Sequence, residues 1–209
     1  MQQSDEPLDR VSRRGFLRGA GASLAAGGVM GALKNSEGEL APKEAALQSG
    51  SDVVTLSFEL NGKSVTTRVR TGFTLLETLR DHLDHTGAKL VCDYGSCGAC
   101  TVLLDSVPVN SCLVLAVECA GRKVETVEGL AKDGKLHPIQ QAFIAEDAMQ
   151  CGFCTPGMIM SCKALLDRKP QPTRQETAEA LAGNICRCGT YINIQRAVDR
   201  AAKSKSGGR

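Results

Sequence analysis

The 209-residue chain has no tryptophan, and aromatic residues make up only 3% of it. A folded core must therefore be built mainly from aliphatic side chains. The chain also lacks a large excess of either charge: it has 25 basic and 23 acidic residues, for a net charge of +2. That balance gives no argument for binding nucleic acid or a membrane surface. The chain also lacks a glycine-rich phosphate-binding loop of the dinucleotide or P-loop kind.

The chain also has few histidines, only three. His82, His85 and His137 are scattered along the chain, with no nucleophile and no paired carboxylates beside them. A histidine in such a setting is more often a surface or packing residue than a catalyst. We therefore expect no catalytic residue in this chain, and any substrate chemistry must belong to another polypeptide.

Cysteine, by contrast, is plentiful, and eight of the ten cysteines fall into two sets of four. The first set is spaced C-x4-C-x2-C-x11-C and consists of Cys92, Cys97, Cys100 and Cys112. This is the spacing of plant-type [2Fe–2S] sites, in which four thiolates hold one cluster. Gly95 and Gly98 allow the loop to turn sharply and bring backbone amides near the cluster sulfurs. The alternative is a zinc site or half of a disulfide framework, although zinc sites usually combine two well-separated ligand pairs.

The second set is spaced C-x2-C-x31-C-x-C and consists of Cys151, Cys154, Cys186 and Cys188. Pro156 follows the first pair and is typical of a first helical turn, so these cysteines are expected at a helix N-terminus. The positive end of a helix dipole favours an anionic cluster there. The second pair follows Gly183, which is typical of a helix C-terminus. Both pairs are thus predicted in turns at helix ends, facing each other across a metal centre.

Cys119 and Cys162 lie outside both sets. We expect both to be free buried thiols that act as small apolar residues. A disulfide bridge or a redox switch is the alternative.

The N-terminal segment has the pattern of a twin-arginine export signal. Arg13 and Arg14 stand within S-R-R-x-F-L-R, and a weakly apolar run from Gly19 to Leu33 follows. The run is too short for a membrane span, and a polar linker comes after it. Because iron–sulfur clusters are assembled on reduced thiols, a route that exports folded proteins lets assembly precede export to the periplasm. The alternative is a chance basic pair before a flexible linker.

The segment after the linker is expected to form a β-grasp, in which a sheet is crossed by one helix. Asn61-Gly62 favours a type I′ hairpin turn, and Thr74 and Glu77 form a capping box at the start of a leucine-lined helix. Apolar patterning predicts five strands, at or near 54–60, 65–69, 101–104, 107–109 and 123–127.

The last third of the chain is expected to be a compact four-helix bundle. Thr173 and Glu176 form a second capping box. The helices are expected at 137–144, 156–166, 173–182 and 191–202. The fold class is therefore α+β. The predicted division is a signal and linker at 1–50, a ferredoxin-like domain at 51–127, a helical domain at 128–204 and a disordered tail at 205–209.

Two stretches carry a family resemblance. CDYGSCGACTV…SC, together with QCGFCTPGMIM…NICRCGTY, resembles the small iron–sulfur subunit of the molybdenum hydroxylases, the xanthine dehydrogenase and aldehyde oxidoreductase family. The resemblance runs from about Val53 to Ala202 and includes all eight ligand positions. It implies a ferredoxin-like domain and a helical domain with one [2Fe–2S] cluster each. With the export signal, the chain resembles the periplasmic aldehyde oxidoreductase type.

The resemblance also implies partners. The chain would relay electrons from a molybdopterin cofactor on a large subunit, where an aldehyde or N-heterocycle is hydroxylated. In the family the helical-domain cluster lies next to that cofactor, and the ferredoxin-domain cluster passes electrons outward, here to an FAD subunit or a cytochrome c. Gln150 corresponds to the glutamine that hydrogen-bonds the pterin, and Cys188 to the ligand cysteine that touches the pterin amine. A free-standing periplasmic electron shuttle and an exported zinc or disulfide module are the alternatives.

Overall fold

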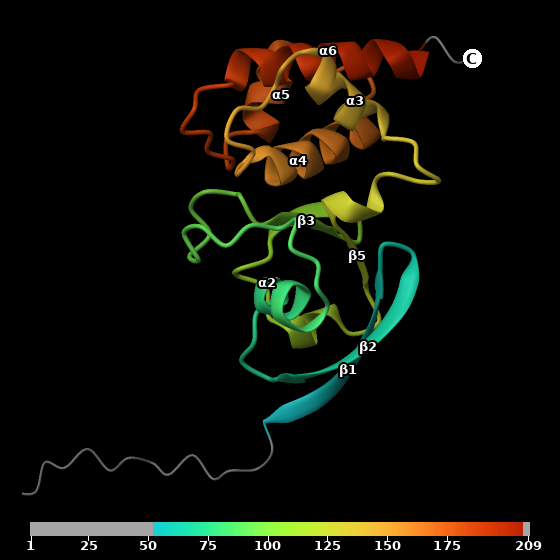
Figure 1. The fold of residues 1–209 in the computed structure, drawn as a ribbon, viewed down its shortest axis with the longest axis vertical. Coiled ribbons are helices and arrows are strands. Elements are labelled where there is room, and N and C mark those ends of the chain that lie inside the picture. The colour runs from blue at the N-terminus through green and yellow to red at the C-terminus, as the bar shows by residue number, and fades with distance from the viewer. Residues whose placement is uncertain (1–51, 207–209) are drawn as a thin grey trace, which may run out of the picture. The chain divides into compact units, whose positions relative to one another are not determined.

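The computed structural model describes residues 52–206. The chain begins there with an antiparallel hairpin formed by β1 (Val53–Leu60) and β2 (Lys63–Arg70), as Figure 1 shows. Asn61 and Gly62 between the strands have φ angles of 52° and 81°, the two positive values that a type I′ turn requires. The predicted hairpin and its turn are confirmed.

Three further strands complete a mixed sheet. They are β3 (Thr101–Leu104), β4 (Val107–Asn110) and β5 (Lys123–Glu125), and the strand order is β2-β1-β5-β3-β4. Strands β1 and β5 run parallel, while the other neighbours run antiparallel. Strand β3, which lies between β5 and β4, is buried along its whole length, because Leu103 packs into the helical core while Val102 and Leu104 pack into the core on the other face of the sheet.

One helix packs on the sheet. The α-helix α2 (Leu75–Glu77) continues directly into a π-helical turn at Thr78–His82. The side chain of Thr74 accepts the N–H of Glu77, and the carboxylate of Glu77 accepts the N–H of Thr74, so the predicted capping box is present. Leu75, Leu76 and Leu79 are at most 1% exposed. The β-grasp prediction is confirmed.

Four helices follow, as predicted from the sequence. They are α3 (Pro138–Ala145), α4 (Thr155–Arg168), α5 (Arg174–Ala180) and α6 (Tyr191–Ser206). Helix α3 packs against α6, and α4 packs against β3. Thr173 and Glu176 form the capping box that begins α5.

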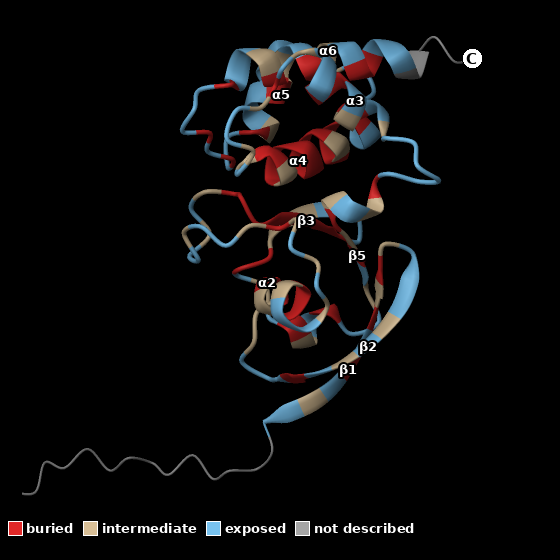
Figure 2. Cartoon of the chain, viewed as in Figure 1, coloured by how far each residue is buried: buried red, intermediate tan, exposed pale blue. Residues whose placement is uncertain are grey.

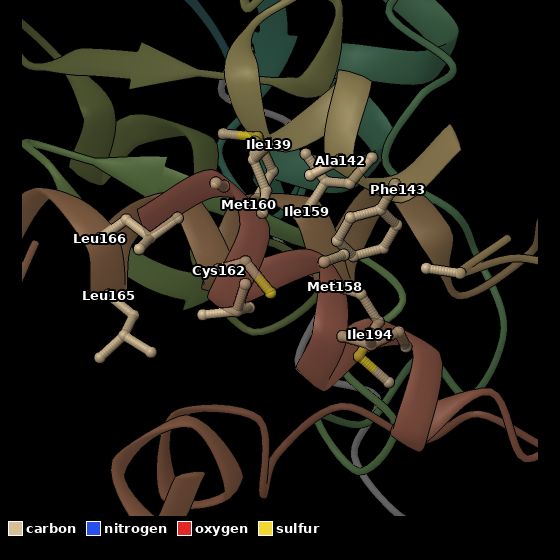
Figure 3. Close-up of a cluster of buried hydrophobic side chains, with 14 of the residues drawn as sticks. Ile139, Ala142, Phe143, Met158, Ile159, Met160, Cys162, Leu165, Leu166 and Ile194 are labelled. Carbon is tan, nitrogen blue, oxygen red and sulfur yellow. The ribbon is translucent and has the colours of Figure 1, made fainter. Parts of the chain in front are cut away.

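Helix α4 is the centre of the helical core, with ten of its fourteen residues buried. Figure 2 shows this concentration of buried residues along α4 and β3. Figure 3 shows Ile139 and Phe143 of α3 beside Met158 and Met160 of α4. The core relies on aliphatic side chains and methionine, with Phe143 its one aromatic member among the described residues. It also includes Leu103 of β3, so it is continuous with one face of the sheet.

Two helix ends differ from prediction. Gly183 was expected to end a helix, but α5 ends at Ala180 and Gly183 has no positive φ, so it is not a left-handed cap. Beyond Ala180 the backbone N–H of Asn184 donates to the carbonyl of Leu181, three residues back, and the chain continues into the loop that carries the second cysteine pair. Helix α6 runs to Ser206, two residues into the predicted tail. No glycine or proline interrupts it before Gly207, and Lys203 near its C-terminus suits the helix dipole.

The predicted signal and linker lie outside the described residues. Within 52–206, none of the helices has the length and the apolar character needed to cross a bilayer. The domain boundary placed between residues 127 and 128 stays a prediction.

Candidate metal centres

The first cysteine set is closed by the pairing of two short strands. Cys100 directly precedes β3, and Cys112 stands two residues after β4. Because Thr101 pairs with Asn110 across these strands, the two cysteines are brought face to face. Their Sγ atoms lie 3.4 Å apart, and both residues are at most 5% exposed.

The other two cysteines of this set lie in the loop before β3. The side chains of Cys92 and Cys97 hydrogen-bond each other, and the backbone N–H groups of Tyr94, Ser96 and Cys97 donate to the Cys92 sulfur. The N–H of Tyr94 contributes most to lowering the pKa of Cys92 to about 6. The loop therefore stabilises a thiolate, which is the form that binds iron.

Two glycines give the loop this shape. Gly95 and Gly98 have φ angles of +78° and +67°, in the region that favours glycine. Burial raises the pKa of Cys112 to about 12, and the N–H of Gly95, which donates to that sulfur, acts in the opposite direction. A backbone amide of this loop thus reaches a cysteine sulfur, as the glycines predict.

The second set is assembled from two helix ends. Cys154 immediately precedes the first residue of α4, and Cys186 and Cys188 lie in the loop between α5 and α6. The Sγ atoms of Cys151 and Cys188 lie 3.5 Å apart, and the side chains of Cys154 and Cys186 hydrogen-bond each other. The two pairs face each other from turns at helix ends, as predicted.

The electrostatics of this set differ from one sulfur to the next. Burial raises the pKa of Cys154 to about 12, and the N–H of Phe153 lowers the pKa of Cys151. For Cys186, burial raises the pKa, but hydrogen bonds, first from the hydroxyl and N–H of Thr190, outweigh it and bring the pKa to about 7.

Both sets fit a cluster of two irons. Within residues 52–206, no three His, Cys, Asp or Glu side chains converge on the position of a single metal ion. The cysteines meet in pairs instead, two pairs in each set. For tetrahedral metal–sulfur bonds of about 2.3 Å, two thiolates on one metal lie about 3.8 Å apart, close to the separations seen here. Each iron of a [2Fe–2S] cluster takes two of the four thiolates.

A buried polar atom supports the second site. The hydroxyl of Thr155, next to Cys154, is buried and has no hydrogen-bond partner in the described part of the chain. Buried hydroxyls are normally paired. A cluster held by Cys154 would bring acceptor sulfurs to this end of α4.

Comparison with known proteins agrees with this geometry. Residues 58–130 match the family model described as a 2Fe-2S iron-sulfur cluster binding domain, and residues 126–199 match the one described as a [2Fe-2S] binding domain. The iron-sulfur-binding subunit PaoA of Escherichia coli aldehyde oxidoreductase is 38% identical over 213 residues, covering 94% of this chain and 91% of the relative. The small subunit of nicotine 6-hydroxylase from Paenarthrobacter nicotinovorans is 49% identical, covering 72% of this chain and 90% of the relative.

A solved structure shows the same fold. Part of quinoline 2-oxidoreductase from Pseudomonas putida superimposes with a TM-score of 0.72 and 39% identity, covering 76% of this chain and 99% of that one. This chain is a small iron–sulfur subunit of the molybdenum hydroxylase family. It therefore contains two [2Fe–2S] domains and belongs to a multi-subunit, molybdenum-dependent oxidoreductase, so the zinc and disulfide alternatives are set aside.

In this molybdenum hydroxylase subunit, the two cysteine sets are linked through the backbone. The N–H of Ile185, the residue before Cys186, donates to the carbonyl of Cys97 at 2.9 Å. A single hydrogen bond therefore connects the main chain of Cys97, in the first set, to the residue next to Cys186, in the second set.

Asn184 reinforces this link and was missed by the sequence reasoning. Its side chain is 6% exposed, and its Nδ2 donates to the carbonyl of Gly98 at 2.9 Å and to Oγ1 of Thr101 at 3.2 Å. Its Oδ1 accepts the hydroxyl of Ser161 in α4 at 2.7 Å. Asn184 thus ties the first cysteine loop, β3 and α4 to the second loop.

Gly157 allows α4 to approach the first loop and was also missed. A Cβ atom at Gly157 would stand 2.2 Å from the carbonyl oxygen of Gly98. A Cβ at Gly98 would in turn stand 2.3 Å from the carbonyl oxygen of Gly183. A glycine inside the apolar stretch after Pro156 is the only sequence signal for this close contact.

Gln150 and the outer cysteine pair lie at the surface. Gln150, Cys151 and Cys188 are all exposed, and Phe153 beside them is 55% exposed. The two residues predicted to face the pterin, Gln150 and Cys188, thus lie on an accessible side of the second site.

The other residues considered in the sequence, two cysteines and three histidines, lie in packing or capping positions. Cys119 and Cys162 are both 0% exposed, and burial raises their pKa values to about 11 and about 12, which confirms them as buried thiols. The ring of His82 contacts that of Phe73 in a tilted arrangement, Nδ1 of His85 lies 2.6 Å from the carbonyl of Leu83, and His137 caps α3.

Proposed function

We propose that electrons enter this chain at the helical-domain site and leave it through the ferredoxin-domain site. The observation that carries the proposal is the 2.9 Å hydrogen bond from the N–H of Ile185 to the carbonyl of Cys97. It gives a short path through the protein between the two sites. The exposed sulfurs of Cys151 and Cys188 offer a point of entry on the other side of the helical-domain site.

The eight paired cysteines are proposed as the ligands. When bound, each [2Fe–2S] cluster supplies a one-electron carrier. The protein's part is to hold four thiolates in place and to supply N–H donors, as the amides of Tyr94, Gly95 and Phe153 do. The ligands are Cys92, Cys97, Cys100 and Cys112 at one site and Cys151, Cys154, Cys186 and Cys188 at the other.

The surface around Gln150 is the proposed contact with a large, molybdopterin-binding subunit. An exposed amide can both donate to and accept from the heteroatoms of a pterin, and Gln150 is adjacent to the exposed Cys151. Replacing Gln150 by alanine should slow reduction of the clusters by substrate about tenfold, as loss of an outer-shell partner does. The control is Gln141, which is exposed on α3 and whose side-chain amide donates a hydrogen bond to the carbonyl of Leu136. Equal rates for Q150A and Q141A would remove Gln150 from the proposal.

The exit side is proposed to face an FAD subunit or a cytochrome c. Leu90, Val91, Tyr94 and Leu113 lie around the first cysteine loop and are 52% to 71% exposed. Apolar side chains in this position suit a protein partner that excludes water from the transfer path.

We also propose a periplasmic location. The relative PaoA aligns with 94% of this chain, and the pattern around Arg13 and Arg14 is that of a twin-arginine signal. Replacing both arginines by lysine should leave this chain and its large partner together in the cytoplasm. A large subunit that still reaches the periplasm would show that it does not travel on this signal.

The deciding experiment is purification of the tagged chain from its native host. We expect a large molybdenum-containing chain to co-purify, together with two irons and two sulfides for each of two clusters. Isolation of the chain alone, with its clusters intact, would favour the shuttle alternative. Iron well below this content would remove the proposed ligand set.

A further inference from the structure

One cysteine sulfur of the helical-domain site has a side-chain donor. Oγ1 of Thr190 lies 3.1 Å from Sγ of Cys186, and the two residues are 5% and 6% exposed. Among residues 52–206, this is the one side-chain hydroxyl that reaches a cysteine sulfur, and it forms no other hydrogen bond there. The backbone N–H groups of Thr190 and Cys188 donate to the same sulfur.

The direction of this hydrogen bond is fixed once Cys186 binds iron. A cysteine that ligates a metal is a thiolate and carries no proton, whereas a threonine hydroxyl always carries one. Thr190 is then the donor and the sulfur is the acceptor. Because both residues are buried, water does not compete for either partner, and the bond is stronger than it would be at the surface.

A hydrogen bond to a ligand sulfur changes the electronics of the metal. Reduction adds negative charge, part of which resides on the sulfurs, so a donor stabilises the reduced state more than the oxidised one. Hydrogen bonds to the sulfurs are among the factors that set the potential of iron–sulfur centres.

The ferredoxin-domain site has no equivalent donor in the described residues. Its sulfurs receive hydrogen bonds from backbone N–H groups, of Tyr94, Ser96 and Cys97 to Cys92 and of Gly95 to Cys112. Threonine is present near this site as well, but Oγ1 of Thr101 donates to the carbonyl of Gly98. A side-chain hydroxyl therefore acts on one site and not on the other.

We propose that Thr190 is a redox-tuning residue, whose hydroxyl raises the reduction potential of the helical-domain cluster selectively. The proposal rests on the proposed ligation of iron by Cys186. Thr190 acts through that sulfur and positions no substrate. Its effect is to make the helical-domain site a better acceptor for electrons from the large subunit.

The test is a redox titration of the intact complex, followed by electron paramagnetic resonance, in the wild type and in T190V. At the wild-type midpoint, T190V should change the ratio of oxidised to reduced helical-domain cluster several-fold in favour of the oxidised form. A tenfold change corresponds to about 59 mV for one electron. The second cluster serves as the internal reference and should keep its potential. T190S retains the hydroxyl and should restore the wild-type value.

Further variants separate tuning from structural effects. T177V is the matched control, because Thr177 is equally buried in the helical domain and its hydroxyl donates to the carbonyl of Thr173. C151S, which changes one ligand atom, identifies the signal of the helical-domain cluster. T190A repeats the measurement should valine impair cluster insertion.

Each outcome has one meaning. Two clusters with unchanged potentials in T190V, or equal shifts of both, overturn the role of Thr190 and leave the proposed ligation standing. Loss of the helical-domain signal in both T190V and T190A, with T190S intact, assigns Thr190 a structural role and also overturns the proposal. Absence of two signals in the wild type would instead overturn the ligation itself.

Discussion

The two cysteine sites reach the same paired arrangement by different means. The ferredoxin-domain site is local: three of its cysteines lie in one loop, and the pairing of Thr101 with Asn110 brings in the fourth. The helical-domain site is assembled from two helix ends separated by 31 residues between Cys154 and Cys186. A local loop needs glycines to bend, whereas a distant pair needs a packed core to hold it.

The two sites also differ in what surrounds their sulfurs. Cys100 and Cys112, on one side of the first site, are buried, and Cys92 and Cys97 are half-buried. The second site has one buried cysteine, Cys186, and an outer pair that is exposed. The site whose cysteines are far apart in sequence is therefore also the more open one. Its geometry depends on the helical core, and its outer pair is available to a partner.

Removal of a ligand should give the largest effects and should distinguish the two sites. C92A and C154A should each halve the iron content, because each removes one ligand from one cluster. C154A should lower the thermal midpoint more than C92A, because metal ligation stabilises most where it joins distant segments. Iron analysis and thermal unfolding followed by cluster absorption would measure both effects. Equal midpoints in the two variants would contradict the contrast between a local and an assembled site.

A glycine between the sites should give the next largest effect. G98A places a Cβ atom 2.3 Å from the carbonyl oxygen of Gly183 and adds a side chain at a φ of +67°. Left-handed strain and overpacking together should cost about 3 kcal/mol or more in the free energy of unfolding.

The control for G98A is G121A. Gly121 has nearly the same φ, +69°, but its Cβ would meet no atom within 4 Å. It should show the strain alone, about 1–2 kcal/mol. Thermal midpoints of the two variants would measure the difference. Similar midpoints would mean that the contact of the two cysteine loops is easily relaxed.

Asn184 should have a smaller effect on the same contact. N184A leaves the buried hydroxyl of Ser161 without its acceptor and removes one of the donors to the carbonyl of Gly98, which keeps those of Thr101, at a cost of about 2 kcal/mol. That corresponds to about 4–8 °C in the thermal midpoint of a domain of this size. Asn193 is the matched control, because its Nδ2 donates to the carbonyl of Asp147 at an exposed position. A midpoint for N184A no lower than that of N193A would show that Asn184 does not hold the two sites together.

The sequence was most informative where one local interaction determines the structure. Asn61-Gly62 requires a turn with two positive φ angles, and Thr74 with Glu77 satisfies the first N–H groups of a helix without help from distant residues. In the first cysteine set, the short separations among Cys92, Cys97 and Cys100 limit in the same way which sulfurs can meet. The turn and the capping box were found where the sequence placed them.

Features that depend on packing between distant segments could not be predicted. Asn184 bonds Gly98, which is 86 positions away in the sequence, and no periodicity indicates such a pair. Gly183 was expected to end a helix, because glycine after an apolar stretch is typical of a helix end. The chain uses that position instead for a close approach of its carbonyl to Gly98. Thr190 has no sequence signal beyond its place two residues after Cys188.

The two capping boxes should give the smallest effects and compare the domains a last time. T74A and T173A each remove one capping hydroxyl, which should cost about 1 kcal/mol. Thr74 is half-buried and begins the helix that carries Leu75 and Leu76, whereas Thr173 is exposed and begins a helix with a single buried residue. We therefore expect T74A to lower the thermal midpoint more than T173A.

The pH dependence of the thermal midpoint tests the second capping box further. In the second box, Lys169 contributes first, and the N–H and hydroxyl of Thr173 next, to lowering the pKa of Glu176 to about 2. A carboxylate with a lowered pKa contributes stability above its ordinary pKa, and that contribution is lost as the pH falls toward 2. T173A removes one of these donors, the hydroxyl, and keeps the backbone N–H, so its difference in thermal midpoint from the wild type should shrink as the pH falls below about 4. A difference that stays constant over that range would mean that the threonine acts on the backbone alone and that the ionised Glu176 is held by Lys169.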